Sequence, residues 1–452
     1  MGYFLKPKRG VAMGAVAFVT ASIVASQCWA ADLEAEIQTL VASHPQIQAA
    51  KEGVDAAQAG IRAARSAYYP QVHLSANAGP EHWDNAQLVQ SFGSPITRDG
   101  YGSGLTVTQH IFDGNATDAA VDSAKDTKGV SDATLTTTRQ TAILEGVNAF
   151  LDVLRQSQLL KLAREDEGRL QNQLHLEDER VDRGSGVAVD VLAAKHRLQL
   201  AKERRVNYEG GLEQAIDRYS QVFGHAPDDM MQTAPEPPAA LVPTTVDEAQ
   251  KIAQEENPAI EAAKRSIDVS TAAIDSARSS YFPSVDLVSK ADFGDNRDGN
   301  LNVSRDWEVL LELNWDLFTG FRTQAQVSQA AHTMAASKDT RDQAERKTSE
   351  AVRLAWSQVQ IARERVEILD SAVNLAYNVW DSRKKMREQG KATVIDVLDS
   401  ESDITNAQIT YLTATFDRKI ATYALLFAMG RLEPGSLAAP AGSSSSPAPT
   451  AK

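Results

Sequence analysis

Residues 351–380 read AVRLAWSQVQIARERVEILDSAVNLAYNVW and lie within a tract, 321–389, that contains neither Gly nor Pro. A single helix over this tract would be about 100 Å long, whereas the mean helix has about 11 residues. Its apolar positions follow the spacing of a coiled-coil seam and are Val352, Trp356, Val359, Ala362, Val366, Leu369, Val373, Ala376 and Trp380. The opposite face is charged, so this helix cannot cross a membrane and must pack sideways against other long helices.

A strict alternation of apolar and polar residues precedes this helix, in the segment 307–318 (WEVLLELNWDLF). A period of two predicts a strand with one buried face. The edge of a soluble sandwich is one interpretation. Trp307 and Trp315 bracket the aliphatic residues, and this favours a membrane strand with aromatic side chains at the two membrane interfaces.

Three blocks of sequence occur twice in the same order, which indicates an internal two-fold repeat. Residues 44–74 align with 257–287, and about half of the aligned positions are identical. The other two pairs of blocks are 105–114 with 311–320, and 184–192 with 390–398. Each copy is therefore expected to contain a helix, two strands, a very long helix, a tight hairpin and a shorter helix.

The predicted fold is mainly α with a small β part. The predicted helices are 44–68, 115–183, 187–223 and 321–389. The predicted strands are 70–80, 102–113, 283–293 and 304–318, with polar loops at 81–101 and 295–303. Helices 44–68 and 187–223 together match the length of 115–183, so they could stack end to end beside it.

Composition predicts the limits of the larger units. The first repeat is expected at 31–224 and the second at 246–430, with a Pro-rich linker at 225–245. The Ala/Ser/Pro-rich tail 431–452 is expected to be disordered. Residues 1–30 have the charged start, apolar core and cleavage site of a signal peptide, which predicts export from the cytoplasm. Lipidation of Cys28 is the alternative to its loss with this peptide.

No later segment has the run of about 18 apolar residues that a membrane helix needs, so any membrane passage must use strands. Four strands cannot close a barrel, and open sheet edges in lipid leave backbone groups without partners. Several copies are therefore expected to contribute four strands each to one barrel, with their helices forming a tube below it. The strand face that would line its lumen carries Thr106, Thr108, His110, Glu308, Glu312 and Asp316.

Over residues 31–430, the sequence resembles the TolC-like outer-membrane efflux and secretion channel family. The resemblance is carried by Tyr-Tyr-Pro and Tyr-Phe-Pro after the duplicated helix, by Phe-Asp-Gly and Phe-Thr-Gly at the strand-to-helix junctions, and by the two Gly-to-Asp-Val-Leu hairpins. It implies a long coiled-coil α-helical barrel joined to a transmembrane β-barrel, closed as a homotrimer. It also implies a place in the cell outer membrane, with the helices extending into the periplasm.

The same resemblance implies that the chain is the outer-membrane channel of a tripartite export system. Its partners would be outer-membrane lipid, a periplasmic adaptor (membrane fusion protein) and an inner-membrane ABC or proton-driven transporter. The cargo would be proteins, as in type I secretion, or small toxic molecules, and the Gly-Arg-Leu ending of the last helix favours secretion. The hairpin residues implied in adaptor docking are Gly184, Gly186, Val187, Gly390, Lys391 and Ala392.

The resemblance further implies that acidic side chains at the hairpin tips form the periplasmic gate, and these are Asp190, Asp396 and Asp399. A structural alternative exists for Asp396, because Thr393 and Asp396 have the spacing of a capping box. Where relatives can carry a tip Arg, this chain has Ala392, which leaves open how a closed state would be held.

The sequence contains no motif of a hydrolase, a metalloprotease or a nucleotide-binding loop, so the chain is not expected to be an enzyme or to need a cofactor. Residues 294–299 (GDNRDG) invite a calcium interpretation, but their acidic residues lack the required spacing, and no metal site is expected. The net charge of −14 without a basic patch argues against a nucleic-acid partner.

Two other functions remain as alternatives. A periplasmic coiled-coil scaffold or adaptor without a pore would explain the long helices but not the alternating strands. A passive porin would explain the strands but not helices that are much longer than a barrel needs.

Overall fold

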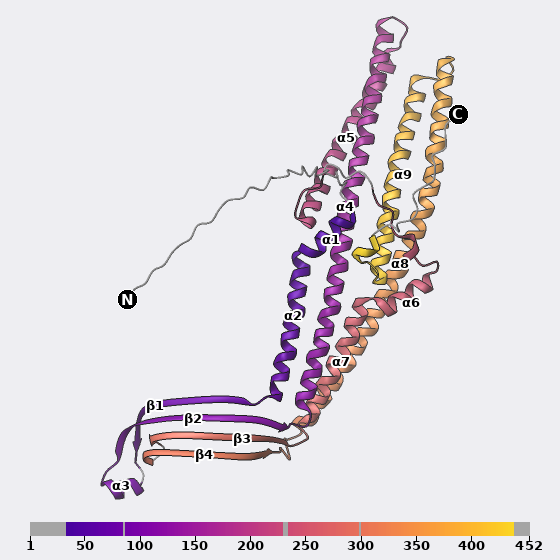
Figure 1. Ribbon diagram of the computed structural model, residues 1–452. Coiled ribbons are helices and arrows are strands. Elements are labelled where there is room, and N and C mark those ends of the chain that lie inside the picture. The colour runs from indigo at the N-terminus through magenta and orange to yellow at the C-terminus, as the bar shows by residue number, and fades with distance from the viewer. Residues whose placement is uncertain (1–32, 85, 229–233, 298–299, 438–452) are drawn as a thin grey trace, which may run out of the picture.

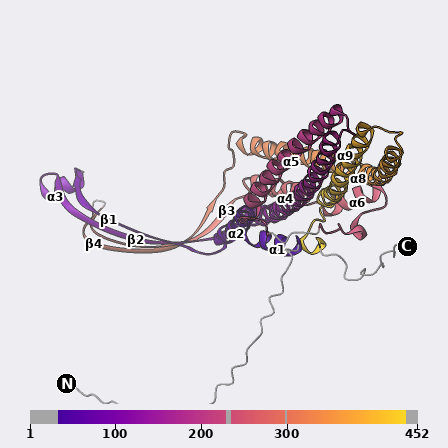
Figure 2. The ribbon, with the colours of Figure 1, turned by 90° about the horizontal axis from the view of Figure 1, so that it is seen from above.

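The structure is a computed structural model that describes residues 33–84, 86–228, 234–297 and 300–437. A four-stranded sheet lies at the foot of a layer of long helices, and its strands run sideways from that layer and curve (Figure 1, Figure 2). The predicted signal peptide 1–30 and residues 438–452 of the predicted tail lie outside the described residues.

Two very long helices run through the whole helical layer. They are α4 (Ala116–Asp182) and α8 (Arg322–Glu388), and each has 67 residues. Their bounds agree closely with the predicted helices 115–183 and 321–389. The absence of Pro from both tracts permits this length, since Pro would remove a backbone hydrogen bond and kink the helix.

Shorter helices stack end to end beside the long ones, as predicted. Helices α5 (Ala188–Phe223) and α9 (Val394–Met429) have 36 residues each and return from the hairpin ends. Helices α2 (Pro45–Arg65) and α7 (Pro258–Ser279) rise from the sheet, and α1 (Leu33–Ser43) and α6 (Val246–Glu256) lie at mid-height. The order across the layer is α5, α4, α9, α8 near the hairpin ends and α2, α4, α7, α8 near the sheet.

The sheet is antiparallel, with the strand order β1-β2-β3-β4. Its strands are β1 (Gln71–Trp83), β2 (Ile96–Phe112), β3 (Ser284–Arg297) and β4 (Asn300–Asn314). Strands β1 and β4 are the edges. Pro80 lies in β1, where a missing backbone N–H is tolerated because one side of an edge strand has no partner in the sheet.

Several predicted strand ends were wrong. Nine residues of the predicted loop 81–101 belong to strands, because β1 and β2 continue to pair as far as Trp83 and Ile96, and α3 (Ala86–Phe92) lies between them. In the predicted loop 295–303, residues 295–297 belong to β3 and residues 300–303 belong to β4. Strand β4 ends at Asn314 rather than at residue 318, because its partner β3 begins at Ser284, directly after Pro283, which has no N–H to extend the ladder.

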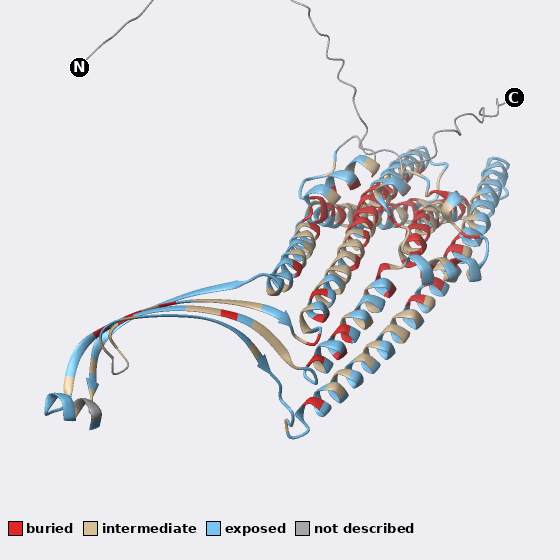
Figure 3. Cartoon of the chain, turned by 60° about the horizontal axis from the view of Figure 1, so that its bottom comes forward, coloured by how far each residue is buried: buried red, intermediate tan, exposed pale blue. Residues whose placement is uncertain are grey.

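The core lies at mid-height in the helical layer, where buried residues gather in Figure 3. Phe150 of α4, Tyr219 of α5 and Leu426 of α9 are fully buried there. Leu432 also belongs to this core, and a short 3-10 helix follows at Pro434–Leu437. The prediction of a disordered tail from residue 431 was therefore wrong for its first residues, which pack beside α1 and α6.

Candidate functional sites on the sheet and at the hairpin ends

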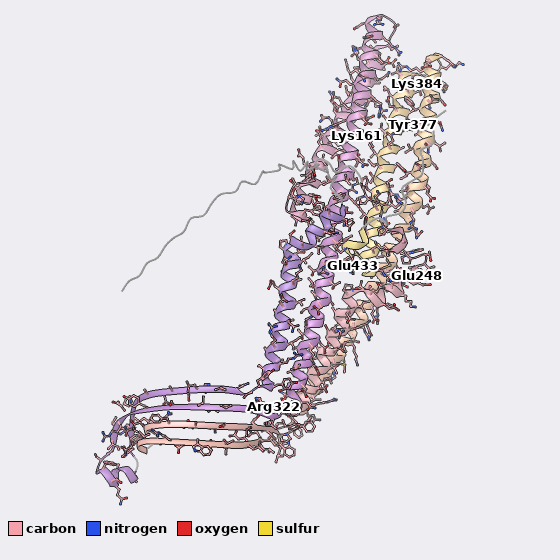
Figure 4. The ribbon with its side chains drawn as sticks, in the orientation of Figure 1. Lys161, Glu248, Arg322, Tyr377, Lys384 and Glu433 are labelled. Carbon is pink, nitrogen blue, oxygen red and sulfur yellow. The ribbon has the colours of Figure 1, made fainter. Side chains whose placement is uncertain are left out.

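The register of the sheet separates a polar face from an apolar one, because cross-strand partners point to the same side. The polar face carries His73, Thr106, Thr108, His110, Asp286, Lys290, Asp292, Asp306, Glu308 and Glu312. The predicted lumen residues His110, Glu308 and Glu312 thus share one face. Asp316 does not lie in the strand; its Oδ2 is 3.6 Å from Nη2 of Arg322 at the foot of α8 (Figure 4).

The charges on this face are partly paired. Lys290 Nζ lies 3.2 Å from Glu308 Oε1 and 3.9 Å from Glu312 Oε1. His110 Nδ1 lies 2.5 Å from Asp286 Oδ1. Carboxylates outnumber the basic groups in these rows, so the face is acidic overall and would favour cations.

The opposite face of the sheet is apolar and exposed in the single chain. Leu74, Leu105, Ala291 and Trp307 form one cross-strand row on it. Trp307 is 82% exposed and Leu311 is 69% exposed, far more than a soluble chain would leave in a continuous row.

Trp315 lies just beyond the end of β4, at the junction between sheet and helices. Its indole N–H donates to the carbonyl of Tyr281 at 3.2 Å, and the side chain is about half exposed. Leu317, Phe318 and Phe321 are exposed beside it in the same junction. An aromatic cluster thus lies at the helix end of the apolar face, and Trp307 lies further along that face.

Both hairpin ends are built on a Gly in the left-handed conformation. Gly184 has φ 73° and Gly390 has φ 72°, a region that favours Gly because it has no Cβ. The N–H of Ser185 donates to the carbonyl of Arg180, and the N–H of Lys391 donates to the carbonyl of Met386. These bonds close each long helix with the same turn.

The predicted docking residues lie in these turns or next to them. Val187 is the N-cap of α5, has no side-chain cap bond and is 60% exposed. Gly186 is packed against the backbone of Val181, where an added Cβ would lie 2.7 Å from its nitrogen. Lys391 and Ala392 follow Gly390 and precede the N-cap Thr393 of α9.

The structure confirms the capping box of Thr393 and Asp396. The Asp396 carboxylate accepts from the Thr393 N–H at 2.9 Å and hydroxyl at 2.7 Å, and the Thr393 hydroxyl accepts from the Asp396 N–H at 3.1 Å. Asp396 Oδ1 also lies 2.6 Å from Nη1 of Arg383 on α8. The Thr393 hydroxyl and N–H, helped by Arg383, lower the pKa of Asp396.

The other two predicted gate acids differ in their surroundings. Asp399 of α9 is paired with Arg197 of α5, so it links the two helical hairpins. Asp190 lies in the first turn of α5 and is half-buried. The hairpin fold thus brings all three acids near the tips, and two of them are neutralised by Arg within the chain.

The sequence analysis missed a buried carboxylate that joins the hairpins. Glu177 of α4 is 3% exposed and accepts from Gln173 at 2.7 Å and from Arg180 at 3.2 Å. Its third donor is the guanidinium of Arg387, near the end of α8 in the other hairpin. Charged partners matter most at a buried carboxylate, and because Arg387 belongs to the other hairpin, this contact stabilises the packing of the two hairpins.

A second buried carboxylate, Asp166 of α4, lies further from the tips and is also 3% exposed. It accepts from Thr405 of α9 at 2.9 Å and lies 3.3 Å from Arg204 of α5. Three helices therefore meet at one carboxylate. Helical periodicity could have indicated that Glu177 and Asp166 lie on an inward face. The sequence gives no sign of which residues of the other hairpin contact them.

Helix α8 has a second apolar seam that no helix in the described part of the chain covers. Its residues recur every seventh position and are about half or more exposed, and they are Leu354, Ile361, Ile368 and Leu375. At the other edge of the layer, α5 exposes Leu192 and Val206. A heptad seam at the layer edge is typical of a helix that packs against another helix.

A groove of about 610 Å³ lies between α4 and α9 above the core, and Leu154, Lys161 and Leu412 contribute to its lining. Over the described residues, no group of three or more His, Cys, Asp or Glu side chains is arranged to hold a metal ion. No helix in the described part of the chain combines the length and the apolar character needed to cross a bilayer.

Comparisons with known proteins agree with this architecture. The outer membrane efflux protein BepC of Brucella suis biovar 1 (strain 1330) is 25% identical over 397 residues, which cover 85% of this chain and 82% of BepC. The alkaline protease secretion protein AprF of Pseudomonas aeruginosa is 25% identical over 408 residues, which cover 87% of this chain and 83% of AprF.

A crystal structure of a membrane protein from Pseudomonas aeruginosa has the same fold, with a TM-score of 0.77 and 20% identity over 88% of this chain and 94% of that one. The model of the outer membrane efflux protein family matches residues 37–225 and 250–431. This family consists of outer-membrane channels, which confirms the prediction that the chain is not an enzyme. Since the two matched segments cover most of the sequence, the chain belongs to the outer membrane efflux protein family.

Proposed function

We propose that this chain is the outer-membrane channel of a tripartite export system, which passes substrates from an inner-membrane transporter to the exterior. Membership of the family supports a channel, and relatives named for efflux and for alkaline protease secretion support export. The observation that carries the proposal is the sheet, with one acidic polar face, one exposed apolar face and two unpaired edges. Such a sheet is stable in lipid only when its edges are closed.

The edges suggest how copies of the chain assemble. Strand β1 and helices α2 and α5 lie along one edge, whereas β4 and α8 lie along the other. Joining unlike edges of successive copies gives a heterologous contact, and such a contact closes into a ring when its repeated rotation completes a full turn. We infer a homotrimer in which the strands close one transmembrane β-barrel, while the exposed seam of α8 packs against the neighbouring copy to complete a tube of helices in the periplasm.

The equal lengths of α4 and α8 and the two separate family matches support an internal two-fold repeat. We propose the repeats at 31–224 and 246–430, joined by the linker 225–245. The signal peptide at residues 1–30 belongs to the same proposal, since export precedes insertion into the outer membrane.

In this assembly the apolar sheet face contacts outer-membrane lipid, with Trp307 and Trp315 at the two interfaces. The polar face lines the lumen with His110, Glu308 and Glu312. Asp316 lies beyond the strand, and we propose it at the inner mouth of the barrel rather than within it.

The hairpin ends then form the periplasmic entrance, with Asp190, Asp396 and Asp399 around it. Arg383 and Arg197 pair with the last two acids, so these acids would attract cations only after those ion pairs open. The buried pair of Glu177 and Arg387 supplies one of the contacts that hold the hairpins together in a chain whose tip residue 392 is Ala.

We further propose that a periplasmic adaptor binds the hairpin ends through Gly184, Gly186, Val187, Gly390, Lys391 and Ala392. Exposure of Val187 at the end of the first hairpin supports this. The adaptor would join the channel to an ABC or proton-driven transporter. The secretion relative AprF favours exported protein as cargo, and the efflux relative BepC favours small molecules.

The test is single-channel recording of the purified protein in a planar bilayer, with its assembly measured by native mass spectrometry. The wild type is expected to be a trimer that conducts in small cation-selective steps. Arg387→Gln should leave the trimer intact and raise the conductance and the open time, because the buried Glu177 loses its partner in the other hairpin.

Arg164→Gln is the matched control, since Arg164 pairs with Glu209 within one hairpin. It should leave the conductance unchanged. Equal conductance of wild type and Arg387→Gln would refute the role of the Glu177 pair. A folded monomer that stays in solution without detergent and never conducts would refute the channel and leave the periplasmic scaffold.

A further inference from the structure

Near the far end of β3 the strand changes direction, and Arg297 lies on the polar face of the sheet. The pairing of β3 with β4 is regular as far as Asp295 and shifts before Arg297, where residues 301 and 302 of β4 form a β-bulge opposite Asn296 alone. Asn296 has φ 49°, a left-handed value that Asn tolerates, and its Oδ1 accepts from the N–H of Asn302 at 3.2 Å. Without this left-handed residue, strict alternation along β3 would place residue 297 on the apolar face with Phe293.

Once on the polar face, Arg297 crosses β2 and reaches β1. Its Nη1 donates to Oδ1 of Asn77, and its Nε lies 3.9 Å from Oε1 of Glu81. Both acceptors belong to β1, the second strand over from β3. The side chain therefore lies flat across the wall of the sheet.

The crossing depends on the absence of a side chain in β2. A Cβ at Gly102 would overlap Nη1 of Arg297 and lie 2.5 Å from Oδ1 of Asn77. Gly79 on β1 shares this face, because it pairs with Gly100, yet a Cβ there would meet nothing within 4 Å. Gly102 is therefore required by the guanidinium above it, and Gly79 is not.

We propose that Arg297 determines ion selectivity at the outer end of the channel. Held flat over Gly102, it leaves the bore open and adds one positive charge per copy beside Glu81, on a face that also carries Arg98 and Lys290 but has more carboxylates than basic groups. This inference rests on the proposed function, because it requires the polar face to line the lumen. A side chain at residue 102 would push the guanidinium off the wall and into the path of ions.

The experiment compares full-length channels in planar bilayers under a KCl gradient, with single-channel conductance and the K⁺ to Cl⁻ permeability ratio as readouts. Gly102→Ala should lower both, whereas the control Gly79→Ala should change neither. Arg297→Gln should raise the ratio at least about twofold without lowering the conductance, because one unit charge acting across roughly 10 Å of water already has a twofold effect and the trimer loses three. The two substitutions thus shift the selectivity in opposite directions.

The double variant Gly102→Ala with Arg297→Gln separates displacement of the side chain from damage to the barrel. It should recover the conductance that Gly102→Ala loses, because the shorter side chain no longer has to clear the new Cβ. Failure to recover, equal behaviour of Gly102→Ala and Gly79→Ala, or an unchanged ratio in Arg297→Gln would overturn the inference. A wild type that forms no channel would refute the proposed function instead.

Discussion

Helices α4 and α8 have the same length and belong to one layer, yet their surroundings differ. Helix α4 lies inside the layer and has buried residues along most of its length, from Ala119 to Glu177. Helix α8 lies at the edge, and its few buried residues end at Ala362. The difference indicates that the apolar residues of α4 are buried within the chain, whereas the exposed seam of α8 is available to contact another molecule.

The largest expected effect comes from charging that free seam. Ile361→Glu with Ile368→Glu should abolish the trimer, because each Ile buried at an interface contributes about 1.5–3 kcal/mol and a buried carboxylate adds a further penalty. Native mass spectrometry of the detergent-solubilised protein measures the result.

A matched control adds the same two charges elsewhere on α8. Gln360→Glu with Asn374→Glu introduces acids at positions directly before two seam residues, about 100° round the helix from the seam, so the trimer should survive. Trimers from both double variants would mean that the seam of Leu354 to Leu375 contacts no second copy.

A smaller effect is expected on the free energy of unfolding of a single chain, where a buried residue and an exposed seam residue can be compared. In the monomer released by the first double variant, Phe150→Ala should lower the free energy of unfolding by about 3–5 kcal/mol, since it opens a cavity in the core. Leu354→Ala should change it by less than about 0.5 kcal/mol, because the side chain is already exposed. Urea unfolding followed by circular dichroism gives both values, and a large loss from Leu354→Ala would show that the seam packs within the chain.

The hairpin ends allow a third comparison, because α9 has a capping box and α5 has no side-chain cap. Thr393→Ala should destabilise the first turn of α9 by about 1 kcal/mol. Val187→Ala should leave the first turn of α5 unchanged. Hydrogen exchange of the amides in these two turns measures the effect, and equal exchange of α9 in Thr393→Ala and wild type would contradict it.

The smallest expected effects are changes of stability with pH. Two acidic residues of α9 should contribute to them with opposite signs. Hydrogen bonds from Thr393 lower the pKa of Asp396 below its ordinary 3.8, so its stabilisation is present above pH 3.8 and is lost as pH falls through the lowered value. Burial raises the pKa of Glu401 above its ordinary 4.5. The folded chain therefore binds a proton at Glu401 more tightly than the unfolded chain does. The free energy of unfolding rises as pH falls through the raised pKa, and this gain is lost again as pH rises.

Urea midpoints measured between pH 7 and pH 3 distinguish these two groups. Asp396→Asn should remove part of the loss of stability in acid, and Glu401→Gln should remove a gain. If both variants shifted the profile in the same direction, one of the two assignments would be incorrect.

Whether a candidate site could be predicted depends on how far apart its residues lie in the sequence. Alternation in 307–314 predicted which residues share a face, and the register confirms that Glu308 and Glu312 do. The capping box at Thr393 was predictable because its two members are three residues apart. The pair of Glu177 and Arg387 was not, since its members lie on different hairpins and neither residue carries a local signature.

The long helices, the strands and the order of elements could be predicted from the amino-acid sequence, because they follow from local periodicity, from the positions of Gly and Pro, and from blocks that occur twice. Three features required the folded structure: which helix covers which face, the end of β4 opposite Ser284, and the place of Arg297 on the polar side of the sheet. These features depend on contacts between residues far apart in the chain, and such contacts leave no period in the sequence.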